Sequence, residues 1–253
     1  MSQHWPHENE TTLTTEAPAH AASELAAPAG AGERRGWATA TAVSADIGSR
    51  VTDVACRTLD IVASIALLVI LSPLLLAIAI AIRVDSPGKP IFRQRRMGRD
   101  LKPFTVNKFR TMRHDAADAP HRDYVVQLIT RGHERPMAKV ARDERVTRLG
   151  RILRRTSLDE LPQLWNVVRG EMSLVGPRPP IPYEVENYPP EWMGRFVVKP
   201  GVTGLWQVSG RSELTLAEMI ALDLEYTRRR SLLFNLEILL RTIPTVLNRR
   251  GAA

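Results

Sequence analysis

One long uncharged apolar run constrains the fold of this chain more than any other feature. Residues 61–82 read IVASIALLVILSPLLLAIAIAI, 22 residues without a charge in which only Ser64, Ser72 and Pro73 fall outside the aliphatic set. A straight helix of that length would be about 33 Å long, enough to cross the hydrocarbon core of a bilayer. The core helix of a soluble domain rarely contains so long an uncharged run. A membrane element is therefore predicted.

Pro73 lies near the middle of this run and bears on how the membrane element is built. Its ring removes a helical hydrogen bond, which predicts a kink, and Ser72 can satisfy a freed backbone group. Each half is then roughly 16 Å long, about half a bilayer. Basic residues flank both ends, and the positive-inside tendency then favours a re-entrant hairpin with both ends in the cytoplasm. A kinked helix that crosses once fits the same residues, so both topologies stay open here.

Charge divides the chain into two unequal parts. Residues 1–50 contain six acidic and three basic residues, a net charge of −3. Because the whole chain has a net charge of +8, the remaining 203 residues carry +11. The first 50 residues are rich in Ala, Thr, Pro and Glu without an apolar period, which predicts a disordered acidic tail. The chain has one cysteine and no Cys/His cluster, which excludes a disulfide-stapled module and a zinc finger.

A basic segment follows the apolar run directly. Residues 89–113 contain nine basic residues and one acid, interleaved with apolar residues in a pattern that predicts a strand hairpin turning at 98–102. Such charge density beside a membrane element suits anionic headgroups or substrate phosphates. Nucleic acid is the less favoured partner, because no recognition motif accompanies the basic residues.

Residues 145–180 hold an adjacent carboxylate pair, Asp159 and Glu160, downstream of clustered arginines. One interpretation is structural: Ser157 and Glu160 fit a capping box, which would place both acids in the first turn of a helix. The other is catalytic. A carboxylate can attack phosphorus to give an acyl phosphate while its neighbour holds Mg²⁺, and arginines bind phosphate oxygens. Arg178, in the rigid sequence Gly-Pro-Arg-Pro-Pro, is a further candidate for phosphate binding.

Several long motifs together resemble one family. They are LSPLLLAIAIAIRVDSPGKPIFRQRRMGR, KPFTVNKFRTM, RLGRILRRTSLDELPQLWNVVRGEMSLVGPRP, VKPGVTGLWQVSGR and LDLEY, in that order along some four-fifths of the chain. The chain resembles the bacterial polyprenyl-phosphate sugar-1-phosphate transferases of the monotopic phosphoglycosyl transferase superfamily, of the type that initiates exopolysaccharide assembly.

The resemblance implies a reaction and a set of site residues. Asp159 matches the nucleophile that attacks the β-phosphorus of a UDP-sugar, releasing UMP, and Glu160 matches the second acid, associated with Mg²⁺. The phosphosugar then passes to polyprenyl phosphate. Residues matched to phosphate or nucleotide binding are Arg154, Arg178, Lys108 and Arg110. Ser72 and Pro73 match the break of a re-entrant helix, which favours the hairpin over a single crossing.

The resulting expectation is an α+β fold, predominantly helical, with a re-entrant membrane helix hairpin, interfacial amphipathic helices and a small antiparallel sheet. Residues 1–50 form the tail, 51–88 the membrane region and 89–253 a membrane-associated catalytic domain on the cytoplasmic side of the bacterial inner membrane. Residues 214–247 are expected to be helical, with an amphipathic pattern.

The expected partners are a UDP-sugar, with UDP-hexose favoured, polyprenyl phosphate, anionic lipid and downstream glycosyltransferases, but not nucleic acid. UDP-N-acetylhexosamines remain open as donors. Two rival functions also remain: a phosphohydrolase that passes an aspartyl phosphate to water, and a non-catalytic membrane scaffold that binds nucleotide or lipid phosphate.

Overall fold

The computed structural model describes residues 47–113, 129 and 145–247. The predicted disordered tail therefore lies almost wholly outside the described residues, as does most of the connection 114–144. The described residues belong to one compact unit.

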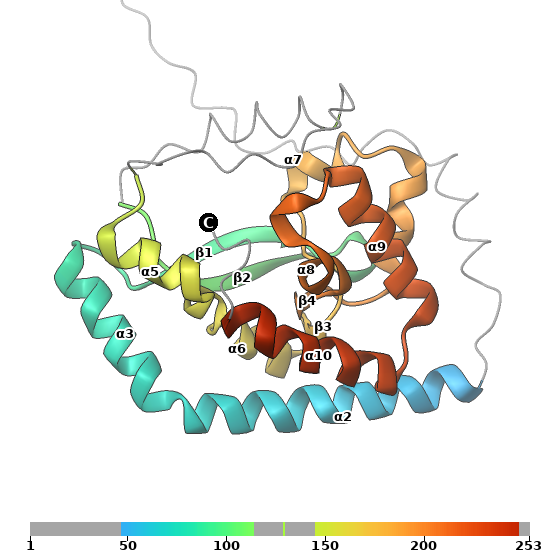
Figure 1. Ribbon diagram of the computed structural model, residues 1–253, viewed down its shortest axis with the longest axis horizontal. Helices are drawn as coiled ribbons and strands as arrows, with labels where there is room; N and C mark the ends of the chain where they lie inside the picture. Colours follow the sequence, from blue (N-terminus) through green and yellow to red (C-terminus); the bar gives the residue numbers. More distant parts are fainter. Residues whose placement is uncertain (1–46, 114–128, 130–144, 248–253) are drawn as a thin grey trace, which may run out of the picture. The chain divides into compact units, whose positions relative to one another are not determined.

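The structure is mainly helical, as predicted (Figure 1). Its α-helices are α2 (Ile47–Ile70), α3 (Ser72–Asp85), α5 (Arg148–Thr156), α6 (Gln163–Arg169), α7 (Pro182–Val185), α8 (Leu205–Ser209), α9 (Leu216–Arg229) and α10 (Leu232–Leu247). Its strands are β1 (Ile91–Met97), β2 (Pro103–Phe109), β3 (Ser173–Val175) and β4 (Gly201–Thr203), and its 3₁₀ helices are η1 (Arg99–Leu101), η2 (Leu158–Glu160), η3 (Pro190–Val197) and η4 (Arg211–Glu213). The predicted antiparallel sheet is present as β1–β2, and a short parallel pair, β3–β4, was not predicted.

The apolar run forms two helices joined by a bend at Leu71. Among the described residues no single helix is both long and apolar enough to cross a membrane, but α2 from Val51 and α3 meet that criterion together, bent by 62°. Pro73 lies in the first turn of α3, where a proline needs no helical partner, and the Ser72 hydroxyl donates to the carbonyl of Val69 at 2.8 Å. The predicted kink is therefore confirmed.

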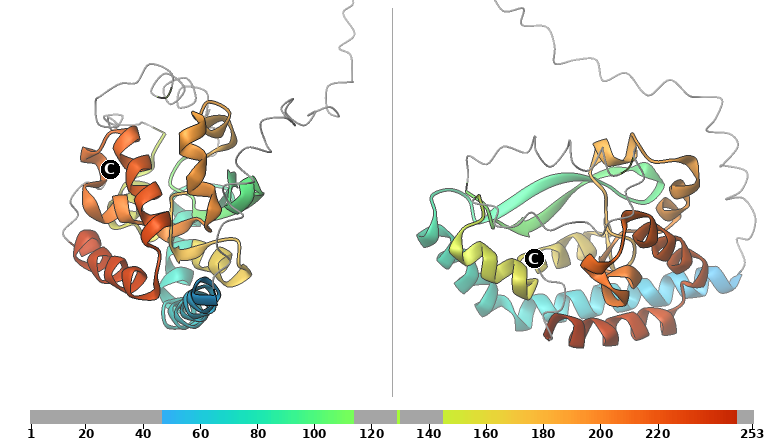
Figure 2. Two further views of the ribbon diagram at one scale, coloured as in Figure 1. Left: turned by 90° about the vertical axis from the view of Figure 1, so that its right-hand side faces the viewer. Right: turned by 45° about the horizontal axis from the view of Figure 1, so that its top comes forward.

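The β1–β2 hairpin carries two different faces. Its register pairs Ile91 with Phe109 and Met97 with Pro103, so Val106 and Lys108 point to one side and Thr105 and Asn107 to the other. Helix α6 packs against β2 and lies between the hairpin and α2 (Figures 1 and 2). The hairpin was expected from the alternating pattern, and its turn lies where predicted.

The principal core lies where β2, α6, the β3–β4 pair, α9 and α10 meet. Its fully buried members include Val167, Met172 and Ile238. Tyr226 of α9 also lies in this core, and its hydroxyl contacts the Val175 carbonyl and the Asn235 side chain, each at 2.9 Å. These contacts hold the C-terminal helices against the sheet that borders the pocket described below.

The expected continuous helix over 214–247 is wrong in one respect. It breaks at Arg230 and Ser231, because the Ser231 side chain accepts from the Phe234 amide at 3.2 Å and begins a second helix. The second helix, α10, keeps the predicted amphipathic pattern. It leaves an exposed apolar set: Leu233, Leu236, Leu240 and Ile243.

Candidate active site

Asp159 and Glu160 lie on the short η2 turn between α5 and α6. The capping box predicted from Ser157 and Glu160 is wrong, because Ser157 has φ 57° and makes no side-chain capping bond. Ser157 instead ends α5 in the left-handed conformation. The acids therefore occupy a single 3₁₀ turn at a reversal of the chain, rather than the first turn of a regular helix.

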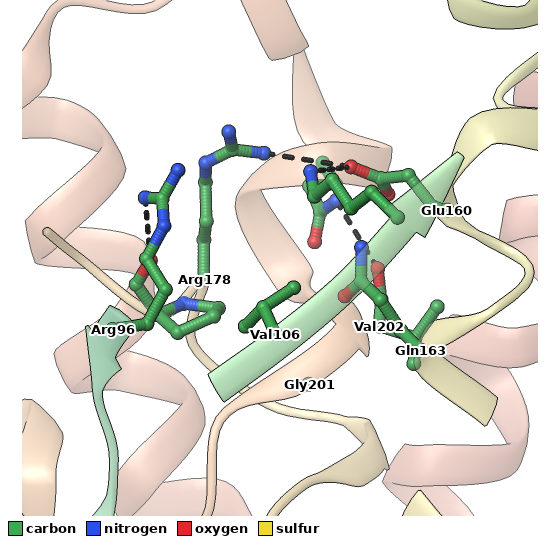
Figure 3. Close-up of a pocket in the computed structure, with 10 residues that line it drawn as sticks. Arg96, Val106, Glu160, Gln163, Arg178, Gly201 and Val202 are labelled. Atoms are coloured by element: carbon green, nitrogen blue, oxygen red, sulfur yellow. Dashed lines mark hydrogen bonds and ion pairs between the residues drawn. The ribbon is translucent and has the colours of Figure 1, made fainter. Parts of the chain in front are cut away.

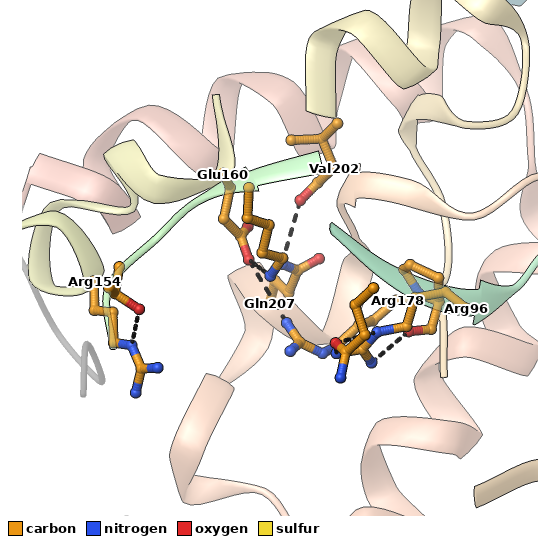
Figure 4. Close-up of polar contacts among 10 residues, drawn as sticks. Arg96, Arg154, Glu160, Arg178, Val202 and Gln207 are labelled. Carbon is orange, nitrogen blue, oxygen red and sulfur yellow. Dashed lines mark hydrogen bonds and ion pairs between the residues drawn. The ribbon is translucent and has the colours of Figure 1, made fainter. Parts of the chain in front are cut away.

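Glu160 is held between two cations (Figure 4). Its Oε1 accepts from Lys108 Nζ at 2.8 Å and lies 3.7 Å from an Arg178 guanidinium nitrogen. Burial by itself would raise the pKa of Glu160, but the charges of Lys108 and Arg178, with Arg211 adding to them, outweigh burial and lower it. Glu160 is therefore ionised at neutral pH.

Asp159 has the opposite electrostatic setting. Burial and the negative charge of Glu160 raise the pKa of its carboxyl group, while Lys108 and Arg154 act to lower it. Burial also lowers the pKa of Lys108, against the attraction of Glu160. Two adjacent carboxylates with pKa values shifted in opposite directions are typical of sites with divided chemical roles.

A small pocket opens beside these residues (Figure 3). It brings together three of the predicted residues, Lys108, Glu160 and Arg178. Its other walls come from β1, β2, α6, β4, α8 and the proline-rich loop: Arg96, Val106, Gln163, Pro179, Gly201, Val202 and Gln207. The positive charges around the single carboxylate suit a ligand that carries several negative charges.

Arg154 reaches the site's edge from α5. Its Nε donates to the Thr111 hydroxyl at 2.9 Å, and its charge acts on Asp159. Helix α5 approaches closely because of Gly150, where a Cβ atom would lie 2.1 Å from the Thr111 carbonyl oxygen. The glycine thus sets the distance between Arg154 and the strand end.

The loop that carries Arg178 is anchored by two further buried arginines. Arg96 donates to the Pro179 carbonyl at 3.0 Å, and Arg195 donates to the Arg178 carbonyl at 2.7 Å. Arg195 also forms an ion pair with Asp223 of α9 at 2.5 Å, with side chains only 5% and 1% exposed. Burial, with the nearby charge of Arg178, lowers the pKa of Arg96 to about 10, so it stays charged at neutral pH.

Arg110 lies apart from the other predicted phosphate ligands. Its guanidinium donates to carbonyls at the end of α3, to Ser86 at 2.8 Å, to Ile82 at 3.5 Å and to Pro87. Cations are favoured at the carboxyl end of a helix. The structure therefore places Arg110 as a cap on α3, and it does not line the pocket.

Comparison with known proteins gives this geometry a context. Residues 51–249 match the family described as bacterial sugar transferase. The chain belongs to that family.

Three relatives illustrate the similarity. A UDP-glucose:undecaprenyl-phosphate glucose-1-phosphate transferase of Caulobacter vibrioides is 43% identical over 208 residues, 79% of this chain and 72% of the relative. The exopolysaccharide production protein ExoY of Rhizobium meliloti is 38% identical over 196 residues, covering 78% and 87%. A UDP-galactose-lipid carrier transferase of Erwinia amylovora is 42% identical over 196 residues, covering 78% of this chain but only 41% of the relative, so the chain spans about two-fifths of that longer protein.

Several residues that line the pocket or hold its loop in place were not predicted. Arg96 is one of nine bases in its segment, and nothing in the local pattern separates it from the exposed ones. Gln163 lies three residues after Glu160, and its uncharged side chain gave no reason to choose it. The pairing of Arg195 with Asp223 joins residues 28 positions apart. Of the two, only Asp223 lay in a motif, LDLEY, that carried any signal.

The residues present are compatible with Mg²⁺ bound together with substrate. Within the described ranges no group of three or more His, Cys, Asp or Glu residues could hold a metal ion. Mg²⁺ commonly binds through one or two carboxylates and the phosphates of the substrate, keeping several waters. Asp159 and Glu160 supply that number of carboxylates, and the contacts of Glu160 with Lys108 and Arg178 both use Oε1.

Proposed function

We propose that this chain transfers a sugar-1-phosphate from a UDP-hexose to polyprenyl phosphate, releasing UMP, as a first membrane step of exopolysaccharide assembly. The observation that carries the proposal is the Asp159–Glu160 pair beside Lys108 and Arg178. The names of the relatives support the substrates, since they specify UDP-glucose or UDP-galactose and undecaprenyl phosphate.

The reaction follows a two-step displacement at phosphorus. An Asp159 carboxylate oxygen attacks the β-phosphorus of the donor, the bond between the β-phosphorus and the bridging oxygen breaks, and UMP leaves with the electron pair. A phosphate oxygen of the lipid acceptor then attacks the same phosphorus. The acyl phosphate bond breaks, Asp159 regains its carboxylate, and the product is a polyprenyl diphosphate sugar.

The surrounding charges have distinct tasks in this proposal. Arg178 and Lys108 bind the diphosphate oxygens, and the positive charge of Arg154 stabilises the ionised carboxylate of Asp159. Asp159 and Glu160 would hold Mg²⁺ with the donor, and the ion would neutralise charge on the diphosphate. The attack requires the ionised carboxylate of Asp159. Because the pKa of this carboxyl group is raised, activity should fall in acid.

The bent α2–α3 pair is proposed to be a re-entrant hairpin that keeps the catalytic domain on the cytoplasmic face. The exposed apolar side chains near the bend support it, among them Val69, Ile70 and Leu76. The exposed apolar set of α10 supports an interfacial position for that helix. Such a position brings the pocket to the height of a lipid phosphate, so the isoprenoid need not leave the bilayer.

Purified full-length protein incubated with Mg²⁺, polyprenyl phosphate and a panel of UDP-sugars tests the proposal. We expect UMP and lipid-linked sugar with UDP-glucose or UDP-galactose. Absence of both products across the panel would refute the transferase assignment and leave the scaffold. Formation of the Asp159 intermediate releases one UMP per enzyme without lipid, so only repeated turnover of UMP release in the absence of lipid would indicate a hydrolase.

Asp159→Asn is the decisive variant. It should remove turnover while the protein still sediments with membranes, because the substitution touches only the nucleophile. Normal turnover in this variant would exclude Asp159 from that role.

A further inference from the structure

A second, larger cleft lies beside the hairpin and shares no lining residue with the pocket of Lys108, Glu160 and Arg178. Its volume is about 760 Å³, within the size range of ligand pockets. It is bounded by the hairpin, by the end of α6 and by Lys199, which precedes β4. Thr105 and Asn107, on its wall, alternate along β2 with the Val106 and Lys108 that face the catalytic pocket.

The charges that line this cleft are unbalanced. Five basic residues and two acids border it: Arg93, Arg99, Lys102, Arg169, Lys199, Asp100 and Glu171. Both acids are already paired with cleft arginines, Asp100 with Arg99 at 3.6 Å and Glu171 with Arg169 at 3.4 Å. An excess of positive charge therefore remains.

Two cations converge above Gly170, which lines the cleft: Lys199, also of the lining, and Arg57 of α2, which lies outside the lining. A Cβ atom placed on Gly170 would lie 3.3 Å from a guanidinium nitrogen of Arg57 and 3.5 Å from Lys199 Nζ. Because both nitrogens lie within these distances of the same Cβ position, they are no more than about 7 Å from each other. A tetrahedral phosphate between them can accept from both, since charge-assisted N–H···O bonds are about 2.7–2.9 Å long.

The two cations are held in different ways. Arg57, on α2, donates to the carbonyls of Val167 and Val168 at 2.6 and 2.9 Å, which fixes it at the carboxyl end of α6. Lys199 Nζ has no hydrogen bond or ion pair within the part of the chain that the structure describes. Burial and then the charge of Arg57 lower the pKa of Lys199, with Arg99 and Arg230 acting in the same direction.

The nearest acid does not complete this group. Asp60 acts on Lys199 from α2, but its Oδ1 accepts from the Ser173 hydroxyl at 3.0 Å and from the Leu174 amide at 2.8 Å. These bonds hold Asp60 toward β3. An anion from outside the described chain would balance the cations.

We propose that this cleft binds the phosphodiester of an anionic phospholipid headgroup between Arg57 and Lys199. Arg57 lies four residues, about 6 Å along the helix, before the uncharged run begins at Ile61. That is headgroup level if α2 enters the bilayer there. The half-exposed indole of Trp165 borders the same cleft, as suits the membrane interface. The choice of a lipid rests on the proposed membrane placement, whereas the phosphate site itself rests on the cleft.

Direct binding tests the proposal without turnover, so its outcome is separate from that of the transferase assay. Full-length protein in neutral detergent is titrated calorimetrically with dihexanoyl phosphatidylglycerol, with dihexanoyl phosphatidylcholine and with inorganic phosphate. We expect saturable binding of phosphatidylglycerol and at least about tenfold weaker binding of the other two. Equal affinity for inorganic phosphate would overturn the lipid as the source, and equal affinity for phosphatidylcholine would overturn the anionic headgroup.

Variants locate the binding. Lys199→Gln should weaken phosphatidylglycerol binding about tenfold, the loss expected for one charge-assisted hydrogen bond, and Lys199→Arg should retain it. Lys89→Gln is the matched control, because Lys89 is exposed, follows α3 and changes the net charge equally. Unchanged binding in Lys199→Gln, or an equal loss in Lys89→Gln, would overturn the site. Circular dichroism and thermal unfolding of each variant confirm that the fold is intact, and Lys199→Arg keeps the test valid if Lys199→Gln unfolds.

Discussion

Removing the carboxylate of Asp223 should both destabilise the protein and loosen the loop that carries Arg178. Asp223 is 1% exposed and pairs at 2.5 Å with Arg195, which is 5% exposed and donates to the carbonyl of Arg178. Asp223→Ala therefore leaves a guanidinium buried without its counter-ion. The same guanidinium fixes the backbone of the arginine that faces Glu160.

The expected size of the effect follows from burial. Breaking a buried ion pair by removing one partner costs roughly 3–5 kcal/mol, whereas an exposed pair contributes about 0–1 kcal/mol. At about 2–4 °C per kcal/mol for a domain of this size, Asp223→Ala should lower the Tm by about 6–20 °C. Glu225→Ala is the control on the same helix, because Glu225 pairs with Arg229 at 2.5 Å with side chains 43% and 57% exposed.

Thermal unfolding in neutral detergent measures the difference. The double variant Arg195→Met with Asp223→Leu separates stability from positioning, since well-packed apolar residues often replace a buried ion pair without loss of stability. We expect it to recover most of the Tm while kcat/KM stays low, because the carbonyl of Arg178 has lost its donor. A Tm loss in Asp223→Ala no larger than in Glu225→Ala would refute the reasoning, as would full activity of the double variant.

Four further outcomes are expected. The pKa of Asp159 is raised, so its contribution to the free energy of unfolding is present in acid and is lost as pH rises through the folded pKa. Asp159→Asn should therefore raise the Tm at pH 7.5, and this gain should shrink towards pH 4. The pKa of Glu160 is lowered, so its contribution to the free energy of unfolding is present at neutral pH and is lost as pH falls through the folded pKa. Glu160→Gln should therefore lower the Tm at pH 7.5. Tm shifts of the same sign in Asp159→Asn and Glu160→Gln would contradict the opposite pKa shifts of the two acids. Gly150→Ala should cost roughly 1–3 kcal/mol in chemical denaturation and reduce turnover, because the added methyl group meets the Thr111 backbone, while the exposed Arg148→Ala should stay within about 0.5 kcal/mol of wild type. Chelation of divalent ions should abolish UMP release and added Mg²⁺ should restore it, and undiminished release in excess chelator would exclude the metal.

Local chemistry predicted the features that depend on near neighbours. Pro73 predicted the bend, because a missing backbone donor acts within one turn. The alternating residues on either side of Gly98 predicted the hairpin, because two strands joined by a short turn pair between residues that are close in sequence. The carboxylate pair was located because its motif is contiguous.

The features that were missed depend on residues distant in the chain. Ser157 has the composition of a helix cap, yet tertiary packing ends α5 there in the left-handed conformation. Arg110 and Lys108 look alike in sequence, and only the position of α3 directs one to carbonyls and the other to Glu160. The three-residue strands β3 and β4 pair across a long connection, which no periodic pattern announces.

The Arg110 cap has a mechanical consequence. It ties the end of α3 to β2, and the Arg110 amide also donates to the Pro90 carbonyl at 2.8 Å. Lys108 lies two residues earlier, within β2, and its Nζ donates to Glu160. Under the proposed membrane placement, a tilt of α3 would be transmitted to Lys108, so that bilayer thickness would change the position of this lysine beside Glu160.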